Sequence, residues 1–153
     1  MRVGRCAVVS QDAFYRRDLP AGVSWESAAA FDWEALLAEV ARCRACHRAV
    51  VVEGFCLLAE PRLAEAEVVV LLECGREEAM RRRLARDAGA GIDDPANTAE
   101  YFEKCVWPAH EEYAKRVEGR VHLRVDTERE ERRRAAERVA QAVEEAMVKK
   151  RET

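Results

Sequence analysis

Short apolar runs separated by longer polar stretches dominate the pattern of this chain. Three of them predict buried β-strands over Cys6–Ser10, Ala49–Glu53 and Val68–Cys74, and a shorter, more polar run predicts a fourth strand over Val121–Asp126. Continuous Val and Leu runs without polar alternation are typical of parallel strands covered by helices on both faces. The pattern therefore favours a parallel sheet.

Helical patterns fill the intervals between these strands. They predict helices over Asp32–Cys43, Arg76–Arg86, Thr98–Val117 and Glu128–Lys150. Because strands and helices alternate, the expected fold class is α/β. The segment Asp87–Asn97 contains two glycines and a proline, and it predicts a mobile lid or an irregular connection.

Length, charge and hydropathy limit the number of domains, the partners and the cellular location that we expect for this protein. At 153 residues the chain is one domain by size. Its net charge of −3 argues against a protein that coats nucleic acid. No apolar stretch reaches the roughly 18 residues of a membrane helix, and the N-terminus lacks the apolar core of a signal peptide. We therefore expect a cytoplasmic protein with neither a nucleic acid nor a membrane as its partner.

Six cysteines are many for such a chain. Most of them lie in apolar contexts, and we interpret them as free thiols that pack as small hydrophobic groups. The run Cys43-Arg44-Ala45-Cys46-His47 matches the haem attachment pattern, but covalent haem attachment normally requires export. The remaining cysteines and histidines do not supply a second ligand pair at zinc spacing. We interpret the match as chance.

Two carboxylates follow apolar strands at their C-terminal ends. Asp12 comes two residues after the first predicted strand, and Glu53 ends the second. Ligand crevices in parallel sheets lie at this edge. One carboxylate could act as a base toward a hydroxyl group, and both could hold a magnesium ion. The alternative is that these acids only mark where the strands reach solvent.

Arginines and aromatic residues supply two further candidate sites. Arg81-Arg82-Arg83 and Arg86 share one predicted helix, where guanidinium groups suit a polyphosphate. The alternative is an ordinary solvated helix face. Trp25 could stack on a planar ring while Glu26 holds ribose hydroxyls, although aromatic residues more often belong to a core.

The order of these motifs resembles the nicotinamide riboside kinases, a branch of the P-loop nucleoside kinases near uridine kinase. The resemblance spans nearly the whole chain. The matching segments are, in order, Ser10-Gln11-Asp12-Ala13-Phe14-Tyr15, Trp25-Glu26 before Ala30-Phe31-Asp32-Trp33, Val52-Glu53-Gly54-Phe55, Arg81-Arg82-Arg83 with Arg86, Asp94-Pro95, and Tyr101-Phe102 before Val106-Trp107-Pro108.

This resemblance implies a P-loop NTPase-type parallel sheet with helices on both faces, in a single domain over residues 1–153 with a lid at about 81–97. It implies transfer of the ATP γ-phosphate to the 5′-hydroxyl of nicotinamide riboside, with magnesium. In the implied roles, Asp12 is the proton acceptor, and Asp12 and Glu53 hold the metal. The nucleoside substrate is bound by Asp12, Tyr15, Trp25, Glu26 and Arg83. The nucleotide is bound by Arg82, Arg86 and Asp126.

The chain also departs from the family pattern. The second acid that the family has after the first strand is replaced by Ala13. The family also has an aromatic residue soon after the lid arginines, and the corresponding position, near Ala88, has none. Uridine and pantothenate kinases are therefore same-class alternatives for the substrate. A non-catalytic nucleoside-binding or regulatory module, docking through exposed sheet edges, is an alternative from another class.

The largest departure is the glycine-rich phosphate loop, Gly-x-x-x-x-Gly-Lys-Ser/Thr, which occurs nowhere in the sequence. In the family it lies with a strand and a helix ahead of the Asp12 strand, and that strand is central in the sheet order 2-3-1-4-5. We expect an N-terminally incomplete kinase with little activity of its own. Loss of the central strand would either separate the Glu53 strand from the strand over Val68–Cys74 or force the two to pair.

Overall fold

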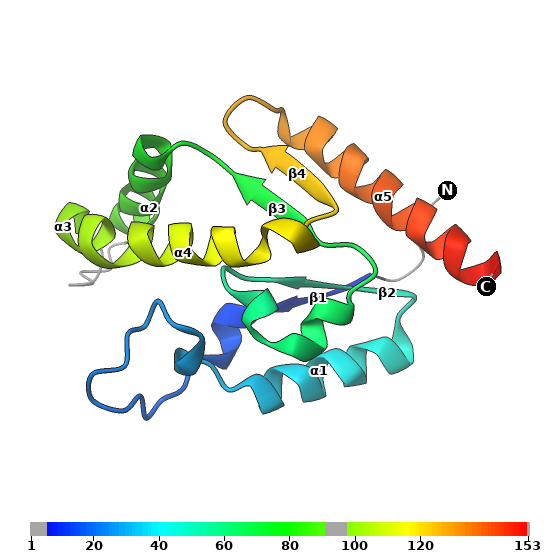
Figure 1. The fold of residues 1–153 in the computed structure, drawn as a ribbon, viewed down its shortest axis with the longest axis horizontal. Coiled ribbons are helices and arrows are strands. Elements are labelled where there is room, and N and C mark those ends of the chain that lie inside the picture. The colour runs from blue at the N-terminus through cyan, green and yellow to red at the C-terminus, as the bar shows by residue number, and fades with distance from the viewer. Residues whose placement is uncertain (1–5, 91–97, 153) are drawn as a thin grey trace. The chain divides into compact units, whose positions relative to one another are not determined.

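A computed structural model of the chain describes residues 6–90 and 98–152 and shows an α/β protein (Figure 1). It divides into two compact units between Ala64 and Glu65. We call them the N-terminal unit and the C-terminal unit and describe each by itself. Of the described helices, none has both the length and the apolar sequence that crossing a membrane demands.

The N-terminal unit is built on two parallel strands. β1 (Cys6–Ser10) pairs with β2 (Ala49–Glu53), in a register that runs from Cys6 opposite Ala49 to Ser10 opposite Glu53. The crossover between the strands contains helix α1 (Trp33–Cys46), as a parallel connection requires (Figure 1). Because the register has no offset, both strands end together at one edge.

Helix α1 covers one face of this strand pair. Its N-cap is Asp32, whose carboxylate accepts a hydrogen bond from the Ala35 N–H at 3.0 Å. Leu36 of the helix and Val9 of β1 are almost completely buried. Val8, which points to the opposite face of β1, is 68% exposed. The unit therefore has its core on the α1 side of the sheet.

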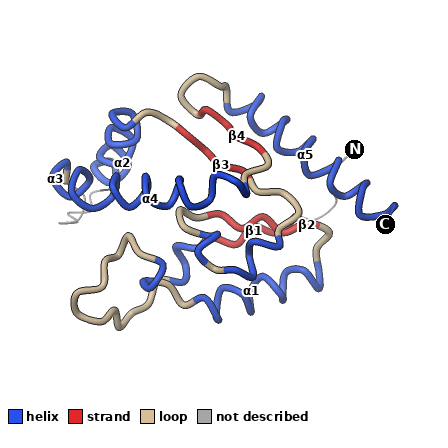
Figure 2. Tube along the Cα trace, viewed as in Figure 1, coloured by secondary structure: helices blue, strands red, loops and turns tan. Residues whose placement is uncertain are grey.

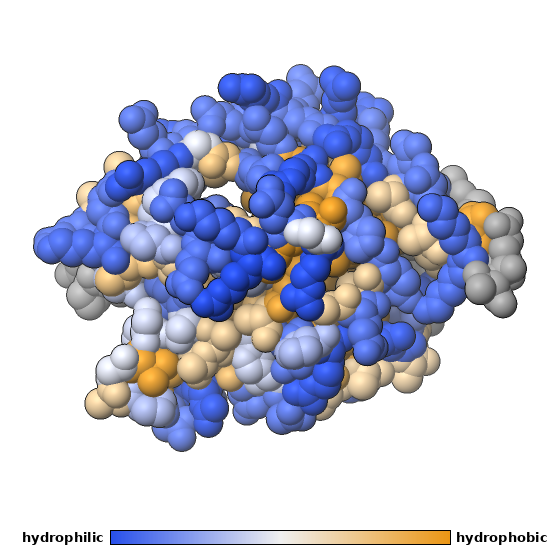
Figure 3. Space-filling model, in the orientation of Figure 1, coloured by the Kyte–Doolittle hydropathy of each residue, from blue (hydrophilic) through white to orange (hydrophobic). Residues whose placement is uncertain are grey.

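The C-terminal unit contains a second parallel pair. β3 (Val70–Glu73) pairs with β4 (Leu123–Asp126) (Figure 2). In this register Glu73 lies opposite Asp126, where both strands end. Its α-helices are α2 (Arg76–Ala90), α3 (Ala99–Tyr101), α4 (Trp107–Val117) and α5 (Arg132–Glu152). Hydrophilic side chains cover most of the face in Figure 3, in keeping with a charged content of 36%.

A π-helical turn over Phe102–Val106 joins α3 to α4, so that residues 99–117 are helical throughout. The side chain of Thr98 caps the start by accepting the Tyr101 N–H at 3.1 Å. Pro108 has no N–H to donate and its ring crowds the preceding turn, which disfavours an unbroken α-helical ladder there. The wider π turn immediately before it accommodates this defect.

The predicted elements agree closely with the structure. The strands at Cys6–Ser10 and Ala49–Glu53 have the expected bounds, and the two later strands are shorter than predicted. The predicted loop over Asp87–Asn97 is wrong at its start, because helix α2 continues to Ala90; residues 91–97 lie outside the described residues.

The described strands form two sheets of two strands each, and β2 does not pair with β3. The α/β class with parallel strands is therefore confirmed, while a single continuous sheet is absent from the described part of the chain.

Candidate functional site

The edge where β1 and β2 end presents two carboxylates. Asp12 lies in the 3-10 turn Gln11–Phe14 directly after β1, and Glu53 is the last residue of β2, opposite Ser10. Both side chains are exposed, and within residues 6–90 and 98–152 neither makes a hydrogen bond or an ion pair. Both carboxylates are therefore available to a ligand.

These two acids are compatible with a magnesium site of the kind found in phosphotransferases. Magnesium is usually held by one or two carboxylates together with substrate phosphates and water. Among the described residues no cluster of three or more Asp, Glu, His or Cys side chains could hold a metal alone. Asp12 and Glu53 at this edge are two carboxylates, the number that a magnesium ion shared with substrate phosphates takes from a protein.

Gln11 joins the turn after β1 to the turn after β2. Its side chain is completely buried, and its Oε1 accepts the N–H of Phe55 at 3.0 Å and that of Cys56 at 3.5 Å. Its Nε2 donates to the Cys56 Sγ at 3.2 Å. The residue before Asp12 is therefore bonded to the residues that follow Glu53.

Gly54 leaves space for this connection. A Cβ atom there would lie 2.5 Å from the Cβ of Gln11, 2.9 Å from its Cδ and closer still to its Oε1. Real Cβ atoms essentially never approach other atoms so closely. A glycine is needed here for the close approach of two turns.

Aromatic side chains line the loop that follows Asp12. Tyr15 and Phe31 form an antiparallel bridge, with Arg16 N–H bonded to the Ala30 carbonyl at 2.9 Å, which closes the loop between them. The Tyr15 ring lies 4.3 Å from that of Phe31 and 5.8 Å, edge to face, from that of Trp25. Phe31 is buried, whereas Trp25 is 47% exposed. The loop thus holds an accessible indole against Tyr15.

Glu26 lies in the same region of the N-terminal unit. Its backbone N–H donates to the Ser24 hydroxyl at 3.1 Å. Burial raises the pKa of the Cys56 thiol to about 11, and the nearby negative charge of Glu26 adds to this rise. Five predicted site residues therefore belong to one end of the N-terminal unit: Asp12, Tyr15, Trp25, Glu26 and Glu53.

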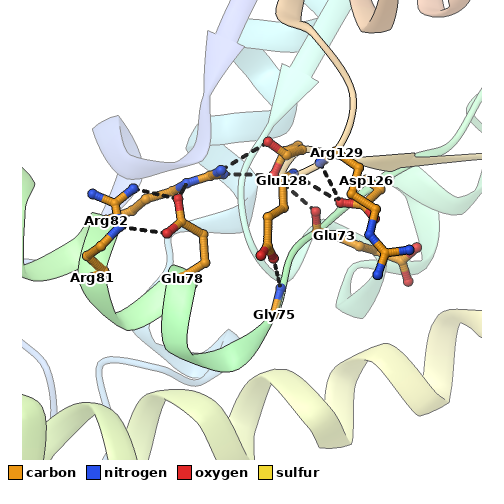
Figure 4. Close-up of polar contacts among 9 residues, drawn as sticks. Glu73, Gly75, Glu78, Arg81, Arg82, Asp126, Glu128 and Arg129 are labelled. Carbon is orange, nitrogen blue, oxygen red and sulfur yellow. Dashed lines mark hydrogen bonds and ion pairs between the residues drawn. The ribbon is translucent and has the colours of Figure 1, made fainter.

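A second polar cluster lies where β3 and β4 end (Figure 4). The Arg82 guanidinium donates from Nε to Glu78 at 2.6 Å, from Nη1 to the Thr127 hydroxyl at 2.8 Å and from Nη2 to the Thr127 carbonyl at 3.0 Å. Glu78 also accepts two hydrogen bonds from Arg81. The two hydrogen bonds of Arg81, and then the one of Arg82, lower the pKa of Glu78 to about 2.

The turn between β4 and α5 is tied to the turn after β3. Asp126 accepts the N–H groups of Glu128 and Arg129 at 3.0 and 3.2 Å, the arrangement of an Asx turn. The Glu128 carboxylate in turn accepts the Gly75 N–H at 3.0 Å (Figure 4). Arg82 and Asp126, both predicted nucleotide ligands, thus flank Thr127 and form hydrogen bonds within the protein.

The other arginines of α2 point elsewhere. The Arg83 guanidinium lies over the Tyr101 ring, 5.9 Å from its centre, and Arg86 is exposed. Neighbouring residues on a helix point about 100° apart. Arg81 and Arg82 therefore share Glu78, whereas Arg83 reaches Tyr101, and the three consecutive arginines do not form one common cradle.

Sequence reasoning missed Gln11, Gly54, Glu78 and Thr127 as parts of these two clusters. A glutamine and a glycine separated by 42 residues carry no periodic signal, and Glu78 looks like any other acid on a charged helix. No family model matches the chain, and no curated protein matches it.

Proposed function

We propose that this chain is a nicotinamide riboside kinase-like protein, which binds a nucleoside and directs its 5′-hydroxyl toward the γ-phosphate of ATP. The observation that carries the proposal is the end of the N-terminal unit. There the Asp12 carboxylate has no partner among the described residues and lies close in sequence to the contacting pair Tyr15 and Trp25. A free carboxylate and an accessible indole suit a hydroxyl and a planar cationic ring, respectively.

In this proposal each residue has a distinct task. Asp12 accepts the proton of the 5′-hydroxyl as that oxygen bonds to the γ-phosphorus and ADP leaves. Trp25 and Tyr15 contact the pyridinium ring, and Glu26 accepts hydrogen bonds from the ribose hydroxyls. Magnesium, when bound, neutralises charge on the transferring phosphoryl group, and Asp12 and Glu53 are the residues that would hold it.

The C-terminal unit supplies the nucleotide side of the proposal. Arg82 and Asp126 flank Thr127 at the ends of β3 and β4, an edge where α/β sheets bind ligands. Arg86 would join Arg82 at the nucleotide, and Arg83 would reach the substrate.

The first experiment measures riboside binding by the chain, using calorimetry with nicotinamide riboside and then with uridine and pantothenate. We expect saturable binding of nicotinamide riboside and its loss in Trp25→Ala. Trp107→Phe, which alters a tryptophan of the C-terminal unit, is the matched control and should bind as the unaltered chain does. A folded chain that binds uridine or pantothenate in preference would refute the assigned substrate.

The second experiment tests phosphoryl transfer. The printed sequence has no Gly-x-x-x-x-Gly-Lys-Ser/Thr loop, so we would fuse a strand, phosphate loop and helix of this type ahead of Met1. The fusion should gain MgATP-dependent formation of the nucleotide, and Asp12→Asn should remove most of that activity. Full activity in Asp12→Asn would refute the role of Asp12. Riboside binding without transfer in the fusion would favour the non-catalytic module.

A further inference from the structure

Gln11 is the only completely buried polar side chain in the described part of the N-terminal unit. It connects the segments that carry Asp12 and Glu53, because Asp12 is its neighbour in sequence and its amide binds the two residues after Gly54. A buried polar group has lost its hydrogen bonds to water, so breaking its hydrogen bonds within the protein is costly. The bonds of Gln11 therefore hold the two turns in a fixed geometry.

The chemistry of this position is specific for a glutamine. Two backbone N–H groups converge on Oε1, which therefore must be the acceptor, and this places Nε2 against the Cys56 sulfur. A glutamate would bring a charge into the buried site, and an asparagine is one methylene too short. Methionine has the length of glutamine but accepts neither N–H group.

We infer that Gln11 is a positioning residue, which sets the place of the Asp12 carboxylate relative to Glu53 by fastening the turn after β1 to the turn after β2. This inference rests on the proposed function, since the carboxylate matters through the riboside that it meets. Gln11 itself is buried, and it acts through Asp12.

The test is a double-mutant cycle on riboside affinity. Asp12→Asn should weaken binding by about tenfold in the unaltered chain, the effect of one hydrogen bond to a charged group. In a Gln11→Met background the same change should cost less than about threefold, because Asp12 is already displaced. Gln141→Met, at an exposed glutamine of α5, is the matched control and should leave the Asp12→Asn effect at its full size.

Two amide measurements separate this inference from the proposed function. Gln11→Met should speed hydrogen exchange at the Phe55 N–H and shift the Asp12 amide resonance, with or without riboside. If the unaltered chain binds no riboside yet both amide effects occur, the positioning role stands and the proposed function fails. If riboside binds but the Asp12→Asn effect is equal in both backgrounds, the proposed function stands and the positioning role is refuted. Unchanged Phe55 exchange in Gln11→Met also refutes it.

Discussion

Gly54→Ala adds one methyl group where the structure has no room for it. The new Cβ would lie 2.5 Å from the Cβ of Gln11, an atom that is fixed by the backbone of the turn after β1. The two turns must therefore separate, or Gln11 must release the N–H groups of Phe55 and Cys56. Either response loosens the end of the N-terminal unit that carries Asp12 and Glu53.

The size of the effect follows from three contributions. Overpacking costs about 1–3 kcal/mol, and unpaired buried N–H groups cost about 1–3 kcal/mol. The two overlap, since the side chain that yields to the methyl is the one that holds the N–H groups. Alanine also restricts the unfolded chain, which stabilises by about 0.4–1 kcal/mol. We expect a net loss of about 2–3 kcal/mol in the free energy of unfolding of the N-terminal unit.

The assay is urea unfolding, monitored by the alkylation of Cys56, which is buried in the N-terminal unit. Gly119→Ala is the matched control, because a Cβ there meets no atom within 4 Å. In a Gln11→Ala background, which removes Cδ and Oε1, the Gly54→Ala change should cost less. Equal urea midpoints for Gly54→Ala and Gly119→Ala would refute the close approach of the two turns.

Three further predictions concern thiols, pH and a helix cap. In the native chain, Cys6 and Cys46 should react with iodoacetamide, whereas Cys43 and Cys56 should react only on unfolding; mass spectrometry of the labelled peptides decides this, and fast labelling of Cys56 would contradict its burial. Because the folded pKa of Glu78 is lowered to about 2, its ionised form contributes stability above the ordinary carboxyl range, and that contribution is lost as the pH falls from about 4.5 toward 2. Glu78→Gln should reduce the change of the urea midpoint with pH over this window. An unchanged pH dependence would contradict the pairing of Glu78 with Arg81 and Arg82. Asp32→Ala should lower the stability of the N-terminal unit by about 1 kcal/mol through loss of the α1 cap, as urea unfolding would measure, and an effect near zero would argue against the bond to Ala35.

The sequence predicted those elements whose signal is local. β1 and β2 are unbroken apolar runs that end at Ser10 and Glu53, so their bounds could be read directly. Helix α2 extends past its expected end into Asp87–Ala90. The two alanines of this segment favour a helix, and its one glycine does not end it. Propensity is a weak guide at such boundaries.

The candidate site was predictable in its residues more than in its geometry. Asp12 and Glu53 follow apolar runs, a position that is visible in the sequence, and the structure places them at one edge. The partners of Gln11 lie 44 and 45 residues away, and the sequence around Phe55 does not predict which group accepts its N–H. Contacts of this kind arise from the pairing of strands and cannot be read from a local pattern.

The two strand ends differ in how much rearrangement a ligand would require. At the N-terminal unit, Asp12 and Glu53 already face solvent without partners among the described residues, so a riboside displaces only water. At the C-terminal unit, Arg82 donates to Glu78 and to two neutral oxygens of Thr127. A phosphate oxygen is a stronger acceptor than either neutral oxygen, since charge-assisted hydrogen bonds are roughly twice as strong as neutral ones. Under the proposed function, Arg82 therefore leaves Thr127 for a phosphate but stays with Thr127 beside an uncharged nucleoside, and this difference makes the C-terminal unit selective for the nucleotide.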